Sequence, residues 1–93
     1  MTGNDAAEVL AIRALGWMAA EEEPLAQFLN ATGMSRDQIP ALAGDPRFLA
    51  AVVDFLLEQD ARVIACCDAL GERYEALRDA RAALPGGRDP HWT

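Results

Sequence analysis

The two cysteines carry the most reactive side chains of this chain, and they are adjacent, at Cys66 and Cys67. Neighbouring side chains on a helix diverge by about 100°, and both cysteines fall on the apolar side of a predicted helix. A cytosolic protein seldom keeps a disulfide between neighbours, and a metal site would need further Cys or His ligands. The single histidine, His91, lies close to the C-terminus. We therefore expect two buried free thiols, with no metal site and no cofactor.

Three consecutive carboxylates, at residues 21–23, are the next candidates for chemistry. Carboxylates ahead of a helix interact favourably with its dipole and can remain in solvent, whereas a divalent cation needs oxygen ligands from spaced positions. The chain also offers no nucleophile paired with a base and no glycine-rich phosphate loop. The sequence thus predicts a protein that is not an enzyme.

Residues 28–43 resemble a helix-turn-helix, the DNA-binding motif in which a second helix reads base edges. Here Gly33 would form the turn, and Arg36 and Gln38 would contact the bases. Against this interpretation, Pro40 interrupts the second helix and Asp37 would lie at the phosphates. Nucleic-acid binding is therefore kept as the alternative function, and we do not expect it.

The charge distribution favours a protein partner over a polyanion. The net charge is −7, and residues 1–60 hold 3 arginines against 10 carboxylates. Such acidity disfavours nucleic acid and anionic membranes. No apolar run reaches the roughly 18 residues of a membrane span, and the N-terminus lacks the order of a signal peptide. We expect a cytoplasmic, non-enzymatic protein that binds another protein or a second copy of itself, with Arg78, Arg81 and Trp92 as candidate contacts.

The residues around these candidates predict an all-α fold with six short helices, because helix formers dominate and no β-alternation is present. The expected helices cover residues 5–20, 24–33, 35–44, 46–58, 60–71 and 72–84. Residues 1–84 would form a single helical domain, and residues 85–93 would form a C-terminal tail.

Most of the predicted helices have recognisable end signals. Asn4 or Asp5 can cap the first helix, and Pro24 suits the first position of the second. Asp45 followed by proline is the clearest start in the chain, and Asp60 can cap the fifth helix. The third helix should begin with a capping box at Ser35 and should split into short turns, because proline disrupts a helix interior.

Residues 8–44 and 46–82 share one pattern of apolar, small and polar positions, shifted by 38. Such a period indicates a supersecondary unit used twice. We therefore expect a compact bundle built from two similar three-helix units, in which the long helices at 8–20 and 46–58 occupy equivalent places.

The predicted apolar faces are wide. Residues Phe48, Val52, Phe55 and Leu56 should form the most deeply buried cluster, because so broad an apolar arc implies a central helix. The face of the fifth predicted helix includes Ile64, which we also expect to be buried, and the sixth predicted helix offers Tyr74 on its apolar face.

Four stretches of the chain carry a resemblance to a known family. They are residues 10–17, 28–33, 45–57 and 80–87. With these segments the chain resembles domain of unknown function (DUF) family 3572, which is common in alphaproteobacteria. The resemblance implies a small cytosolic bacterial protein and carries no activity, and Pro40 departs from the helix former expected at that place.

Overall fold

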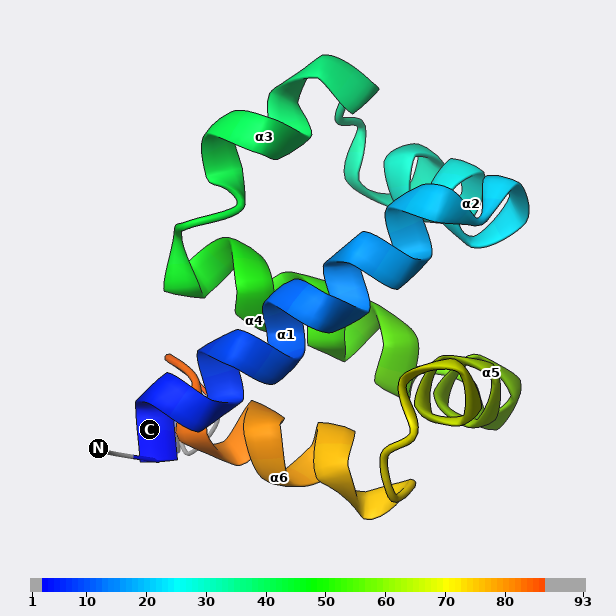
Figure 1. The fold of residues 1–93 in the computed structure, drawn as a ribbon. Helices are drawn as coiled ribbons and strands as arrows, with labels where there is room; N and C mark the ends of the chain where they lie inside the picture. The colour runs from blue at the N-terminus through cyan, green and yellow to red at the C-terminus, as the bar shows by residue number, and fades with distance from the viewer. Residues whose placement is uncertain (1–2, 87–93) are drawn as a thin grey trace.

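The computed structural model describes residues 3–86, which form an all-α bundle without strands (Figure 1). This confirms the predicted fold class. The elements are α1 (Gly3–Ala20), α2 (Glu22–Thr32), the 3-10 turn η1 (Arg36–Gln38), α3 (Ile39–Leu42), α4 (Pro46–Leu57), α5 (Asp60–Leu70) and α6 (Glu75–Ala83).

Helices α1 and α4 cross at the centre of the bundle and are covered unequally by the other helices. Helix α6 packs against both of them, α5 also contacts both, and α2 packs on α1. Figure 1 shows α6 below the central pair, whereas η1 and α3 lie apart from the rest at the top. Ile39 of α3 is nevertheless buried in the common core, with an exposure of 8%.

The core forms around an aromatic cluster that joins α2 to α4. The Phe28 ring contacts the rings of Phe48 and Phe55 edge-on, with centroid distances of 5.9 and 5.3 Å. The predicted cluster on α4 is buried, but Phe28, at 1% exposure, lies deeper than Phe48 at 8% or Phe55 at 5%. The expectation that the α4 cluster is the deepest is thus wrong for its two aromatic residues. Phe28 comes from the covering helix α2, and its ring contacts both α4 rings edge-on.

Several predicted helix ends are confirmed. Gly33 and Gly71 end α2 and α5 in the left-handed conformation, with φ of 74° and 72°. The Asp45 carboxylate accepts a hydrogen bond from the backbone N–H of Arg47 at 2.9 Å and so caps α4. At η1, the side-chain oxygen of Gln38 accepts a hydrogen bond from the backbone N–H of the capping serine at 2.8 Å.

The two helices nearest the N-terminus begin earlier than predicted. Helix α1 begins at Gly3, so Asn4 and Asp5 lie within its first turn instead of preceding it. Helix α2 begins at Glu22, which places Pro24 at its third residue. Proline is tolerated throughout a first turn, because the first backbone N–H groups of a helix need no acceptor within it.

The last two helices also begin at other residues than predicted. Gln59 occupies the cap position of α5, and Asp60 is the first helical residue. Helix α6 begins at Glu75 and not at residue 72. After α5, the backbone N–H groups of Gly71 and Glu72 both donate to the carbonyl of Cys67, which closes the turn and delays the next helix.

The two halves agree in their first two helices and differ in the third. The left-handed glycines lie 38 residues apart, as the repeat requires. In the first half, however, the third segment consists of η1 and the four residues of α3, with Pro40 in its first turn. In the second half it is the nine-residue α6, which packs on α1 and α4. Superposition of the two halves stays a prediction.

Candidate functional site

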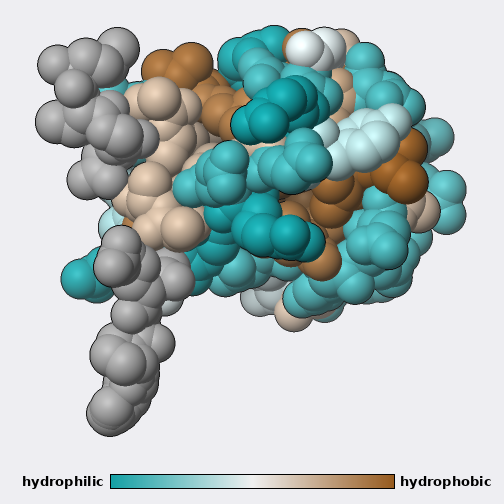
Figure 2. Space-filling model, turned by 90° about the horizontal axis from the view of Figure 1, so that it is seen from below, coloured by the Kyte–Doolittle hydropathy of each residue, from teal (hydrophilic) through white to brown (hydrophobic). Residues whose placement is uncertain are grey.

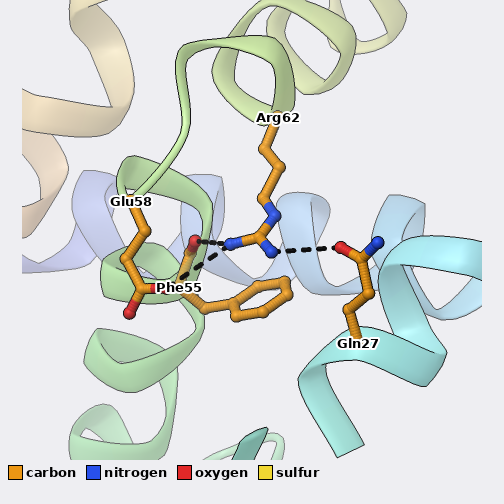
Figure 3. Close-up of polar contacts among 4 residues, drawn as sticks. All are labelled: Gln27, Phe55, Glu58 and Arg62. Carbon is orange, nitrogen blue, oxygen red and sulfur yellow. Dashed lines mark hydrogen bonds and ion pairs between the residues drawn. The ribbon is translucent and has the colours of Figure 1, made fainter. Parts of the chain in front are cut away.

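A buried guanidinium connects three helices, and sequence analysis did not single it out (Figure 3). The Arg62 carbon Cζ lies 3.8 Å from the centroid of the Phe55 ring. Its two terminal nitrogens donate to the Phe55 carbonyl at 2.8 Å and to the Gln27 side-chain oxygen at 3.0 Å. An ion pair to Glu58 spans 3.5 Å, and the Arg62 side chain is only 12% exposed. These contacts engage both terminal nitrogens, while the buried Nε of Arg62 has no hydrogen-bond partner in the described chain. Because the contacts join α5 to α4 and α2, we assign this cation a structural role.

Two further arginines also have partners within the fold. Arg13 donates to the Glu72 carboxylate at 2.7 Å and to the Leu70 carbonyl at 2.8 Å. Arg81, a candidate contact from the sequence, donates to Asp54 at 2.5 Å and to the Pro85 carbonyl at 3.0 Å. A partner carboxylate would have to displace Asp54 to reach Arg81. Arg81 is thus positioned to hold α6 on α4.

Arg78, the other candidate arginine, lies at a hollow of about 300 Å³ between the end of α4, the outer side of α5 and the start of α6. We call this hollow the α4–α5–α6 groove. It is lined by Leu57, Asp60, Val63, Ile64, Tyr74, Glu75 and Arg78. A hollow of this size is at the lower end of the range for small-molecule pockets and can also receive one or two side chains of a partner.

Two large apolar side chains of the groove are exposed, Ile64 at 44% and Tyr74 at 49%. Ile64 was expected to be buried, and that expectation is wrong. Tyr74 was expected on the apolar face of the sixth helix, but it precedes α6, so it is not on the inward face of that helix. Ile64 lies on the flank of α5 that the groove leaves uncovered. Figure 2, which views the molecule from below Figure 1, shows hydrophobic surface between hydrophilic groups on the side of the molecule where α6 lies.

The polar groups of the groove include one side chain that is held in place and three that are not. The Tyr74 hydroxyl donates to Asp68 at 2.8 Å, and this hydrogen bond raises the pKa of Tyr74. Within residues 3–86, the charged groups of Asp60, Glu75 and Arg78 have no ion pair or hydrogen bond. The groove therefore combines an apolar lining with unpaired charges of both signs.

Residues 4–87 match the model of a family described as "Protein of unknown function (DUF3572)". The chain belongs to this family. The match includes every helix from α2 to α6, all but the first residue of α1, and the whole groove. No curated protein and no solved structure shows a significant match to the chain.

Residues 28–43 of this DUF3572 member, whose sequence resembles a helix-turn-helix, include the end of α2, a turn and two short helical segments. Arg36 is exposed, but the Gln38 side-chain oxygen is engaged by the backbone N–H of Ser35 at 2.8 Å. After the Gly33 turn the chain forms only the three residues of η1 and the four of α3. The segment thus lacks the extended second helix that normally enters a major groove.

The cysteines of this DUF3572 member lie in the core, as predicted. Cys66 and Cys67 are free and are exposed by only 0% and 1%. Burial raises the pKa of the Cys66 thiol to about 12, and burial likewise raises that of Cys67. Because the thiolate is the reactive form, these side chains are poor nucleophiles near neutral pH.

Other candidate sites fall partly outside the described residues. Within residues 3–86, no three Cys, His, Asp or Glu side chains are grouped so as to hold a metal ion. None of the helices described there is long and apolar enough to span a bilayer. Trp92 and His91 lie outside the described residues.

Proposed function

We propose that this protein is a cytosolic, non-enzymatic protein that acts by binding another protein through the α4–α5–α6 groove. The observation that carries the proposal is that two of the four large exposed apolar side chains of residues 3–86, Ile64 and Tyr74, line the same hollow. Apolar surface rimmed by polar groups is a common mark of interaction sites.

Further observations favour binding over catalysis. The two thiols are buried and have raised pKa values, which argues against their use as nucleophiles. Arg62 and Arg13 are committed to contacts between helices. By contrast, the charged groups of the groove are unpaired within the described chain and are free to meet a partner.

Photocrosslinking in cells that produce the full chain tests this proposal. A benzoylphenylalanine at position 74 should crosslink to a protein, and Ile64→Ser should abolish that crosslink. The control places the same photoreactive residue at position 9, because Val9 is 58% exposed on α1 and does not line the groove. Equal crosslinking from both positions, or none from position 74, would contradict a groove-specific partner.

An electrophoretic shift at low salt tests the nucleic-acid alternative. A shift of genomic DNA fragments that survives competitor DNA and is lost in Arg36→Ala would favour the helix-turn-helix function. The present proposal expects no such shift.

A further inference from the structure

We infer that the occupant of the α4–α5–α6 groove is a basic amphipathic helix of a partner protein. This inference rests on the proposed function and adds the chemistry of the partner. The apolar face of the incoming helix would contact Ile64 and Tyr74, and its basic residues would pair with Asp60 and Glu75.

The lining of the groove suits the apolar side chains of a helix. The groove is bounded by parts of three helices, and its lining includes the half-buried side chains of Leu57 and Val63 beside the exposed Ile64 and Tyr74. An amphipathic helix binds such a surface by inserting apolar side chains spaced three or four residues apart. No strand is present in residues 3–86, so an extended peptide would find no sheet edge there to join.

The charges of the groove select a basic partner. Asp60 is the first residue of α5 and Glu75 the first residue of α6, so the two carboxylates approach the groove from different helices. Neither is paired in the described chain, and Arg78 is the single cation of the lining. The whole chain carries a net charge of −7, which would attract a cationic partner over a longer range. Arg78 would then pair with an acidic residue of the partner and help to orient it.

The other surface features favour an outside partner at this groove. Val9 and Ile12 are exposed on α1 but line neither this groove nor the two other hollows named below. A second hollow, between α1 and α6, is lined largely by alanines and offers few large apolar contacts. A third contains Arg62 and Gln27, which already bind each other.

Two synthetic helical peptides test the inference directly. Both are 18 residues long with the same leucine stripe, and the polar face carries mainly lysine in one peptide and mainly glutamate in the other. Titration into the full-length 15N-labelled protein should shift the amide resonances of Ile64 and Tyr74 with the lysine peptide. The glutamate peptide should bind at least tenfold more weakly. No groove shift with the lysine peptide, or equal affinity for both peptides, would overturn the inference.

Charge variants separate specific pairing from general attraction. Asp60→Asn combined with Glu75→Gln should lower the affinity for the lysine peptide about threefold to tenfold, since exposed ion pairs contribute modestly. The matched control is Asp37→Asn combined with Glu22→Gln, which removes the same charge from exposed positions away from the groove. Equal weakening by the two double variants would show that only net charge matters, and would overturn the inference.

The two proposals can fail separately. Suppose Ile64→Ser abolishes the crosslink from position 74 while the charge variants leave peptide affinity unchanged. The groove then binds a protein, but the inference that its partner is a basic helix is wrong. Concentration-dependent dimers lost in Ile64→Ser would identify a second copy as the occupant. Shifts of the groove resonances on deletion of residues 88–93 would identify the chain's own terminus, and either result would overturn the inference.

Discussion

Three guanidinium groups act as cross-links between elements, in a chain that contains eight arginines and no lysine. Arg13 joins α1 to the turn after α5, Arg62 joins α5 to α2 and α4, and Arg81 joins α6 to α4. Each guanidinium contacts a backbone carbonyl as well as a side chain. A planar fork with several donors can satisfy two acceptors at once, which an ammonium on a flexible stem does less well.

Replacement of Arg62 by lysine should therefore destabilise the protein although the charge is kept. We expect a loss of about 1–2 kcal/mol in the free energy of unfolding, because lysine cannot both stack on Phe55 and reach Gln27. Arg47→Lys is the matched control, since Arg47 is exposed on α4 and its side chain has no partner within the described residues. Urea denaturation measures both variants, and equal stabilities would contradict the structural role of Arg62.

The Cys66 thiol should make stability depend on alkaline pH. Burial raises its pKa from 9.0 to about 12, so the folded protein holds this proton more tightly than the unfolded chain does. The contribution of the protonated Cys66 thiol to the free energy of unfolding is fully present below about pH 9 and is lost as the pH rises toward 12. The slope from this group is about 1.4 kcal/mol per pH unit in that window.

Urea denaturation between pH 8 and pH 11 can measure this slope. Cys66→Ala should be less stable at neutral pH, because it leaves a small cavity, but its stability should fall less steeply with pH. Cys67, whose thiol pKa is also raised by burial, should leave a residual slope. Parallel pH profiles for the wild type and Cys66→Ala would show that this thiol is not the group that titrates.

At the scale of elements, the helices end where local backbone geometry requires it. The glycines after α2 and α5 adopt φ of +74° and +72°, which L residues with a side chain rarely adopt. A Cβ at either position would meet no atom within 4 Å. The cost of a side chain there comes from backbone strain, without a steric clash with other groups.

Gly33→Ala and Gly71→Ala should each cost about 1 kcal/mol, the strain of a left-handed residue with a Cβ less the gain from a stiffer unfolded chain. Gly16→Ala is the matched control, since Gly16 lies inside α1 and its added Cβ also meets nothing within 4 Å. That variant should gain about 0.5–1 kcal/mol from helix propensity. Thermal unfolding should show opposite shifts, and the same sign for all three would contradict this account.

At the scale of the whole molecule, the two halves of the repeat are interlocked. Helix α1 of the first half packs against α4, α5 and α6 of the second. The fully buried α1 residues Ala11, Ala14 and Met18 are thus covered largely by the other half. The repeat describes architecture and not two independent folding units.

Fragments 1–44 and 45–93 should therefore be largely unfolded when separate, because short isolated helices are marginal in water. Mixed at equal concentration, they should recover helical circular dichroism at 222 nm and a cooperative melt. An equimolar mixture of fragment 45–93 with a scrambled 1–44 peptide is the control. Cooperative melting of either fragment alone would contradict this prediction.

Local sequence patterns determined the helices and their ends to within a few residues. The Asp45 cap, the two left-handed glycines and the division of the third segment into two short turns could be predicted because each depends on a few neighbouring residues. The burial of the adjacent cysteines could also be predicted, since both lie on one apolar face.

Only the tertiary structure decided which apolar and charged groups are covered. The Arg62–Gln27 contact joins residues 35 positions apart, and no local pattern indicates it. Periodicity shows which side of a helix is apolar, but neighbouring helices decide how much of that side is buried. The sequence therefore predicted Ile64 to be buried and Tyr74 to lie on an apolar helix face, whereas the late start of α6 and the spacing of α4, α5 and α6 leave both in an open groove.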